Sequence, residues 1–211
     1  MKINYRPEID GLRAIAILSV VFYHAKISIF GNQIFSGGFL GVDIFFVISG
    51  YLITSIILKE LKETGKFSFS LFYQRRIRRI IPALVFLMLF CIPFAWFILT
   101  PASFEDFSKS IIYSLGFTSN FYFWHTGLQY GTESGFLKPF LHTWSLSVEE
   151  QYYIIFPLLF FIFFKFLKNY LNYILIIGFI ISLFLAEWGS RNYPSFNFYV
   201  LPTRGWELLA G

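Results

Sequence analysis

The sequence predicts an all-α fold: a polytopic transmembrane helix bundle with about six spanning or re-entrant helices and the start of another. Of its 211 residues, 56% are hydrophobic and only 14% are charged, whereas soluble domains contain about 45–50% apolar and about 25% charged residues. Mean hydropathy is +0.63. Phe, Tyr and Trp alone make up 23% of the chain, more apolar surface than a water-soluble fold of this size can bury. The composition therefore indicates an integral membrane protein.

The same composition excludes several other classes of protein. Disordered chains are poor in these apolar residues, and a single cysteine, Cys91, excludes a disulfide scaffold. The net charge of +5 fits basic cytoplasmic loops better than a nucleic-acid partner. Asp10 and Arg13 interrupt the first apolar stretch, so it is not a cleaved signal peptide.

Apolar stretches of spanning length follow one another along the chain. A spanning helix needs about 17–25 mostly apolar residues. The stretches that meet or approach this length are Leu12–Phe30, Phe39–Leu58, Ile80–Leu99, Gln151–Leu167 and Tyr170–Ala186. A further stretch, Phe107–Trp124, has interspersed Ser, Thr and Asn residues and either crosses the membrane or lies at its interface.

Basic residues predict the orientation of the bundle. The connection Lys59–Arg79 carries seven basic and two acidic residues, whereas Lys26–Gly38 carries one lysine. We therefore expect Lys59–Arg79 and the N-terminus to be cytoplasmic. Lys165 and Lys168 also indicate a cytoplasmic loop. Because successive loops alternate between the two sides of the membrane, this loop can be cytoplasmic only if Phe107–Trp124 does not cross fully. We expect a re-entrant or interfacial segment there.

The last residues, TRGWELLAG, resemble the opening of another helix, with a polar Thr-Arg pair before an apolar run. We expect residues 1–211 to form a single integral-membrane domain that is the N-terminal portion of a longer one.

Ionisable residues inside spanning segments cost about 2.5–3.5 kcal/mol each and mark function by default. Arg13 and His24 are 11 residues apart, which places them within about 20° of one helix face and about 16 Å apart along the axis. Asp10 is one turn before Arg13 and can pair with it. His24 is a candidate proton acceptor because its pKa near neutrality suits a general base. Alternatively, Arg13 extends to the interface and His24 bonds to a neighbouring helix.

Asp43 lies within a glycine-rich run that continues to Gly50. The seven-residue spacing places Asp43 and Gly50 on one helix face, and glycines allow another helix or a ligand to approach closely. A carboxylate at this depth needs a partner, and Arg13 or His24 is the candidate. Asp43 acts either in catalysis or in a structural ion pair.

Four arginines, Arg75, Arg76, Arg78 and Arg79, directly precede an apolar stretch. Guanidinium groups bind phosphate through two parallel hydrogen bonds. The cluster therefore predicts a cytoplasmic, phosphate-rich ligand. Alternatively, its positive charge only fixes the orientation of the helices in the membrane.

The run from His142 to Tyr153 combines His142, Trp144, Ser145, Glu149 and Glu150 before an apolar stretch. Serine followed by acidic residues is typical of a helix N-cap and first turn, but this explains only one of the two carboxylates. We expect His142, Trp144 and Ser145 to contact substrate, and Glu149 or Glu150 to act in catalysis.

The sequence offers neither a standard metal-ligand spacing nor a covalent nucleophile motif. The histidines and acids fit no such spacing, so we expect no metal. Direct transfer assisted by a base is the simplest chemistry.

At these places the sequence resembles the membrane acyltransferase 3 family, which contains bacterial O-antigen and exopolysaccharide O-acetyltransferases. Five runs occur in the family's order from residue 5 to 211: YRPEIDGLRAIAILSVVFYHA, GGFLGVDIFFVISGYLIT, FYQRRIRRIIPAL, HTWSLSVEEQYYIIFPLL and LPTRGWELLAG.

The resemblance implies transfer of an acyl group, usually acetyl, from cytoplasmic acyl-CoA to a sugar hydroxyl of a cell-envelope or secreted glycan such as lipopolysaccharide. The donor is a substrate, with no permanently bound cofactor, and the acceptor is a glycan or a lipid-linked sugar. The family's catalytic His and Arg correspond to His24 and Arg13, and its acid to Glu149 or Glu150. Its arginine cluster matches the four arginines above, and the setting is the bacterial cytoplasmic membrane.

Two interpretations from other classes stay open. Buried Arg, Asp, His and Glu also describe the proton relay of a transporter, although the matched broken-helix repeats typical of transporters are absent from the sequence. An inactive membrane scaffold would tolerate replacement of Arg13 and His24.

Overall fold

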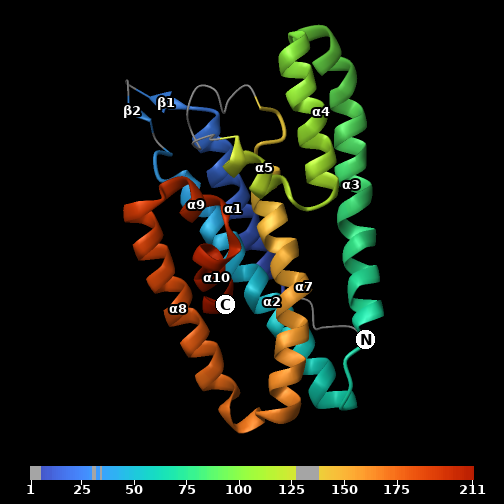
Figure 1. Cartoon of the computed structure of the whole chain (residues 1–211), viewed down its shortest axis with the longest axis vertical. Coiled ribbons are helices and arrows are strands. Elements are labelled where there is room, and N and C mark those ends of the chain that lie inside the picture. Colours follow the sequence, from blue (N-terminus) through green and yellow to red (C-terminus); the bar gives the residue numbers. More distant parts are fainter. Residues whose placement is uncertain (1–5, 30–31, 34, 127–137) are drawn as a thin grey trace.

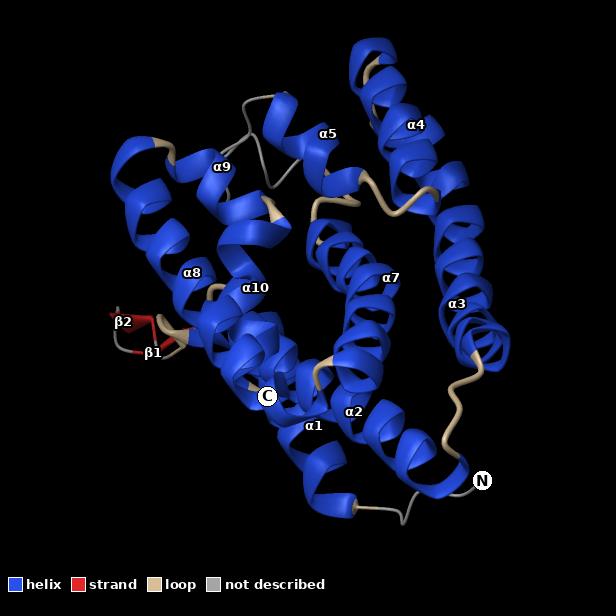
Figure 2. Ribbon diagram, turned by 60° about the horizontal axis from the view of Figure 1, so that its bottom comes forward, coloured by secondary structure: helices blue, strands red, loops and turns tan. Residues whose placement is uncertain are grey.

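A computed structural model describes residues 6–29, 32–33, 35–126 and 138–211. Long helices run roughly parallel to one another and form one elongated bundle (Figure 1). Two short strands, β1 (Ser28–Ile29) and β2 (Asn32–Gln33), pair antiparallel at the margin of the bundle (Figure 2). The predicted all-α membrane bundle is confirmed.

Four helical segments are long and apolar enough to span a membrane: Gly38–Thr64, Phe69–Ile98, Thr143–Phe166 and Lys168–Asn192. They comprise η1 (Gly38–Leu40) with α2 (Gly41–Thr64), then α3 (Phe69–Ile98), α7 (Thr143–Phe166), and η2 (Lys168–Tyr170) with α8 (Leu171–Asn192). Each corresponds to a predicted span but extends into polar sequence. α3 begins eleven residues before the predicted Ile80 because the arginine-rich segment is itself helical, and the Ser68 hydroxyl accepts a hydrogen bond from the Leu71 amide at its start.

The first helix begins and ends earlier in the sequence than the predicted span Leu12–Phe30. α1 covers Pro7–His24 and is not among the four helices that meet the length and hydropathy criteria. Its first turns carry Glu8, Asp10 and Arg13, which leaves too few apolar turns to cross alone. The predicted end at Phe30 lies outside the described residues.

The segment between α3 and α7 does not cross the bundle. α4 (Pro101–Leu115) folds back beside α3, and α5 (Ser119–His125) packs near the start of α7. The α2–α3 and α7–α8 connections therefore lie at one end (Figure 1). This end, here called the basic end, carries Lys59–Arg79 together with Lys165 and Lys168. In the described residues between α3 and α7 the chain thus folds back, as expected for a re-entrant or interfacial segment.

After α8 the chain turns through α9 (Pro194–Tyr199) into α10 (Leu201–Ala210), which packs between α8 and α2. The predicted helix at the terminal run is confirmed. A Cβ at Gly50 would lie 1.8 Å from the Leu208 carbonyl oxygen, so only glycine lets these two backbones meet. Gly38 and Gly41 allow α1 the same approach, since a Cβ at either would lie 2.2 Å from an α1 carbonyl oxygen.

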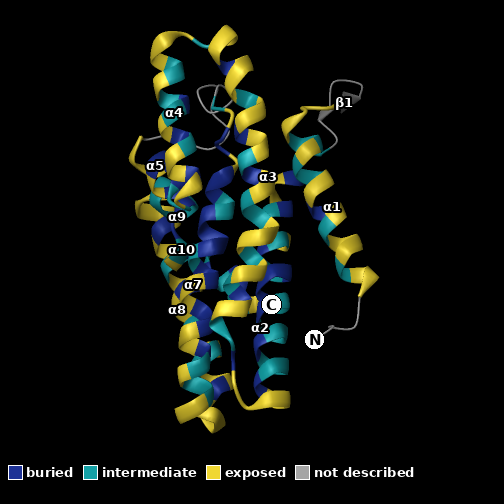
Figure 3. Ribbon diagram, turned by 90° about the vertical axis from the view of Figure 1, so that its right-hand side faces the viewer, coloured by how far each residue is buried: buried dark blue, intermediate teal, exposed yellow. Residues whose placement is uncertain are grey.

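The bundle buries aromatic residues and exposes apolar ones. Large fully buried side chains include Trp144, Tyr153 and Phe46. The outward faces of α3 and α8 are mostly exposed (Figure 3), with Phe97 85% and Phe184 71% exposed. Apolar side chains directed outward around a satisfied helical backbone suit a hydrocarbon environment.

Candidate functional site

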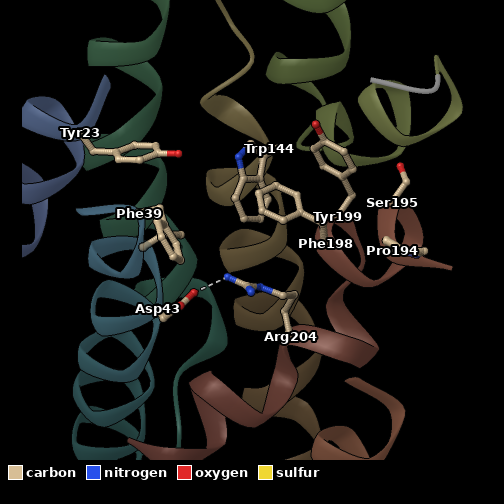
Figure 4. Close-up of a pocket in the computed structure, with 10 residues that line it drawn as sticks. Tyr23, Phe39, Asp43, Trp144, Pro194, Ser195, Phe198, Tyr199 and Arg204 are labelled. Carbon is tan, nitrogen blue, oxygen red and sulfur yellow. Dashed lines mark hydrogen bonds and ion pairs between the residues drawn. The ribbon is translucent and has the colours of Figure 1, made fainter. Parts of the chain in front are cut away.

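A cavity of about 530 Å³ lies at the end of the bundle opposite the basic end, between α1, α2, α7, α9 and α10. We call it the aromatic cavity. Its walls include aromatic rings, which come from four elements, and one ion pair (Figure 4). The lining includes Tyr23, Phe39, Asp43, Trp144, Phe198 and Arg204.

Arg204 lies at the centre of this cavity's charged wall. One guanidinium nitrogen donates to the Asp43 carboxylate, and another lies 3.0 Å from a carboxylate oxygen of Glu207. The side chains of Arg204 and Glu207 are 16% and 1% exposed. The group therefore combines one cation with two carboxylates, largely out of water.

Three aromatic rings surround the Arg204 guanidinium. Its carbon lies 5.7 Å from the ring centroids of Phe46, Trp144 and Phe198, within the range of cation–π attraction. Trp144 and Phe198 also contact each other, with ring centroids 4.4 Å apart. The charge is thus held in a rigid aromatic frame.

The predicted partner of Asp43 was wrong. Neither Arg13 nor His24 forms its ion pair; the partner is Arg204, which α10 brings back into the bundle beside α2. Asp43 and Gly50 do share one face, as predicted, because Gly50 contacts Leu208 of the same α10.

Arg13 and His24 lie at different depths on one continuous helix. Arg13 pairs with Asp10 at 3.9 Å, as predicted, and its guanidinium lies 5.3 Å from the Phe45 ring centroid. His24 ends α1, and its ring stands edge-on to Tyr23 with centroids 5.2 Å apart. Because Tyr23 lines the aromatic cavity, His24 lies beside that cavity.

The three predicted substrate contacts differ in position. Trp144 lines the cavity, whereas the Ser145 hydroxyl donates to the His142 carbonyl and so remains within its own helix turn. His142 keeps some solvent contact, but the protein atoms around its ring displace enough water to lower its pKa. The charge of His24 lowers this pKa further.

Glu149 and Glu150 are not in the first turn of a helix. α7 already begins at Thr143, so the N-cap interpretation was wrong. These carboxylates lie deeper, 7% and 8% exposed. Glu149 accepts hydrogen bonds from the hydroxyls of Ser49 and Tyr153.

The arginine cluster on α3 lies at the basic end and divides in two. Arg76 points inward, with its guanidinium 4.4 Å from the Tyr153 ring centroid and within electrostatic range of Glu150. Arg75 lies 3.9 Å from Glu60. Arg78 and Arg79 are exposed and are the members free to meet a ligand at this end.

Within the described ranges, no three His, Cys, Asp or Glu side chains gather as a metal site. The site therefore consists of a carboxylate–guanidinium group and aromatic rings, with His24 beside Tyr23 at its margin.

The profile of a family described as "Acyltransferase domain", the acyltransferase 3 family, matches residues 6–211. The chain belongs to this family. It is 36% identical to the peptidoglycan O-acetyltransferase OatA of Listeria monocytogenes over 99% of the chain and 33% of that protein. It is 39% identical to the O-acetyltransferase OatA of Staphylococcus aureus over 74% of the chain and 24% of that protein. The chain thus spans at most about a third of these relatives, and no solved structure matches it.

In this acyltransferase 3 domain, the sequence interpretation missed Arg204 and Glu207. A usable signal was present, since an Arg and a Glu three residues apart occur in an apolar terminal run. Such a pair is typical of an ion pair on one helix face, but nothing local indicates that it reaches Asp43.

Proposed function

We propose that this acyltransferase 3 domain moves an acetyl group from acetyl-CoA to a sugar hydroxyl of a cell-envelope glycan. The observation that supports this best is the separation of two unlike sites. The start of α3, which carries the exposed Arg78 and Arg79, lies at one end of the bundle (Figure 1), whereas the aromatic cavity is lined from α1, α9 and the starts of α2 and α7, toward the other end. An enzyme with a cytoplasmic donor and an external acceptor needs such a separation.

The basic end suits the donor. Coenzyme A ends in phosphates, and the guanidinium groups of Arg78 and Arg79 can each bind one through two hydrogen bonds. The extended pantetheine arm carries the thioester away from the phosphates, so the two parts need not bind at the same depth. We place the basic end and the N-terminus in the cytoplasm on the positive-inside rule.

The aromatic cavity suits a sugar acceptor. Ligand sites combine apolar and aromatic walls with a few polar groups that fix orientation. Phe39, which is 46% exposed, offers a flat face to the C–H face of a pyranose ring, and Asp43 and Arg204 can bind its hydroxyls. The Listeria relative is named for peptidoglycan, and we propose the same class of acceptor here.

His24 is our proposed general base. The acceptor oxygen attacks the thioester carbon, the new C–O bond forms, the C–S bond breaks, and the hydroxyl proton passes to the His24 imidazole. A positioned base contributes typically about 10²–10⁴-fold to such a step. His24 is exposed at the end of α1, with its ring edge-on to Tyr23 of the aromatic cavity.

The test is acetyl transfer from labelled acetyl-CoA in membranes that contain the intact protein, at equal expression. His24→Ala should lower the rate by about 10²-fold or more, whereas His125→Ala, which removes an exposed histidine at the end of α5, should leave it unchanged. A His24→Ala rate above about a tenth of wild type would make His24 a packing residue.

A further inference from the structure

A second cavity, of about 580 Å³, lies beside the aromatic cavity and is not used above. We call it the Trp188 cavity. It is formed by α5, α8 and α9, and its lining includes Trp124, Trp188, Asn192, Tyr193, Ser195 and Phe196. Pro194 and Ser195 line both cavities. Figure 4 shows these two residues at the edge of the aromatic cavity farthest from Tyr23.

Two aromatic pairs form the walls of the Trp188 cavity. Trp124 stands edge-on to Phe196 with ring centroids 5.3 Å apart, and Trp188 meets Tyr193 at 5.5 Å. The two tryptophans are 39% and 46% exposed. Each ring is therefore held by a neighbour and still presents a free face.

The polar groups of this cavity are uncharged. The Ser195 hydroxyl is buried and, within the described residues, has no hydrogen-bond partner. The Asn192 amide nitrogen donates to the Trp188 carbonyl at 2.8 Å, which leaves the amide oxygen to accept from a ligand. No charged side chain lines the described part of the cavity.

These features favour one class of ligand. Flat rings with a hydroxyl and an amide oxygen suit a neutral sugar, which offers both C–H faces and hydroxyls. An anionic lipid headgroup would instead need Lys or Arg. A belt of aromatic residues at the membrane interface explains exposed tryptophans, but not the unpartnered Ser195 hydroxyl in a hollow that adjoins the acceptor site.

We propose that the Trp188 cavity binds the sugar next to the one that is acetylated, so that the domain recognises a glycan chain rather than a single sugar. The inference rests on the proposed function in taking the acceptor to be a glycan. A chain that passes over Pro194 and Ser195 occupies both cavities at once, and binding at the second cavity holds the first sugar beside His24.

The test measures binding without donor, so it does not depend on transfer. The intact protein, purified in detergent, is titrated with peptidoglycan glycan-strand fragments of one, two and four sugars. Wild type should bind the two-sugar fragment about tenfold more tightly than one sugar. Trp188→Ala should abolish this gain and leave one-sugar binding unchanged, and Ser195→Ala should reduce it.

Trp96→Ala is the matched control, because Trp96 is a 68% exposed tryptophan on α3 outside both cavities; it should keep the full gain. Equal affinity of the wild type for one and two sugars would overturn the inference. So would a Trp188→Ala variant that loses affinity equally for fragments of every length. Failure of the proposed function looks different, since it appears as absent acetyl transfer whatever the fragments bind.

Discussion

The carboxylate of Asp43 accepts a hydrogen bond from the guanidinium of Arg204, 161 residues away along the chain. This contact closes the bundle, because it joins α2 to the last helix and shapes one wall of the aromatic cavity. It also compensates a carboxylate that would otherwise be costly at this depth.

Arg204→Met should destabilise the protein by about 3 kcal/mol, because the buried Glu207 and the partly buried Asp43 then lack a counter-charge. The midpoint of thermal unfolding in detergent measures this. Arg191→Met is the control, since it breaks an exposed pair with Glu187 and should cost less than about 1 kcal/mol. Adding Asp43→Asn and Glu207→Gln to Arg204→Met should recover part of the loss; no recovery would mean that charge is not the cause.

Gly50→Ala should destabilise the bundle by about 1–3 kcal/mol, because the new methyl group would collide with the Leu208 backbone. Gly178→Ala on α8 is the matched control, since its Cβ would lie 3.5 Å from the flexible end of Leu209. The same thermal midpoint compares the two. Equal midpoints for both variants would show that α2 and α10 are less tightly packed than described.

Replacing Arg78 and Arg79 together by Lys should raise the KM for acetyl-CoA by about tenfold while membrane insertion stays normal. Lys keeps the positive charge that sets topology but loses the planar fork that binds phosphate. Steady-state acetyl transfer at varied donor concentration measures the effect. A wild-type KM in the Lys variant would leave the cluster with a topological role alone.

Glu149→Gln should reduce acetyl transfer more than Glu150→Gln, because the Glu149 carboxylate accepts hydrogen bonds from both Ser49 and Tyr153, and loss of its negative charge weakens both of them. If the two groups act as a unit, Tyr153→Phe should add little to the Glu149→Gln loss in a double-mutant cycle. Additive losses would show that Tyr153 acts independently.

The rate of transfer should rise with pH and then level off, because a protonated imidazole cannot accept the acceptor's proton. If His24 is the one group that must lose a proton, a plot of log kcat/KM from about pH 5 to pH 8 should have a low-pH slope of one proton; His142, whose pKa is also lowered by burial, is the second histidine that could contribute. A slope of two protons would mean that both histidines must be neutral.

Much of the fold follows from local patterns in the sequence. Apolar length marks α2, α3, α7 and α8, and the lysines at 165 and 168 indicate that the segment before α7 folds back. Glycine spacing identifies the face of α2 that meets another helix. These predictions succeed because hydrophobic length and loop charge act locally.

The site was less predictable because it depends on contacts between distant residues. The partner of Asp43 depends on where α10 returns, which no local pattern reports. Ser145 and Ser147 ahead of two acids imitate an N-cap, but α7 already begins at Thr143, so the acids lie inside the bundle. The N-cap interpretation of this pattern was therefore wrong, because it used only the residues next to the two acids.

The backbone-to-backbone contact at Gly50 also bears on how the walls of the aromatic cavity are joined. Helices that touch through their main chains cannot slide apart without losing the whole contact, so α10 is fixed to α2, and the glycines at 38 and 41 fix α1 to η1 and α2 in the same way. The short α9 meets α8 through a side chain instead, since a Cβ at Gly189 would lie 2.8 Å from the Asn197 amide oxygen. The α2 and α10 walls of the cavity, which carry Asp43 and Arg204, are therefore one mechanical unit, to which α9 is attached through side chains.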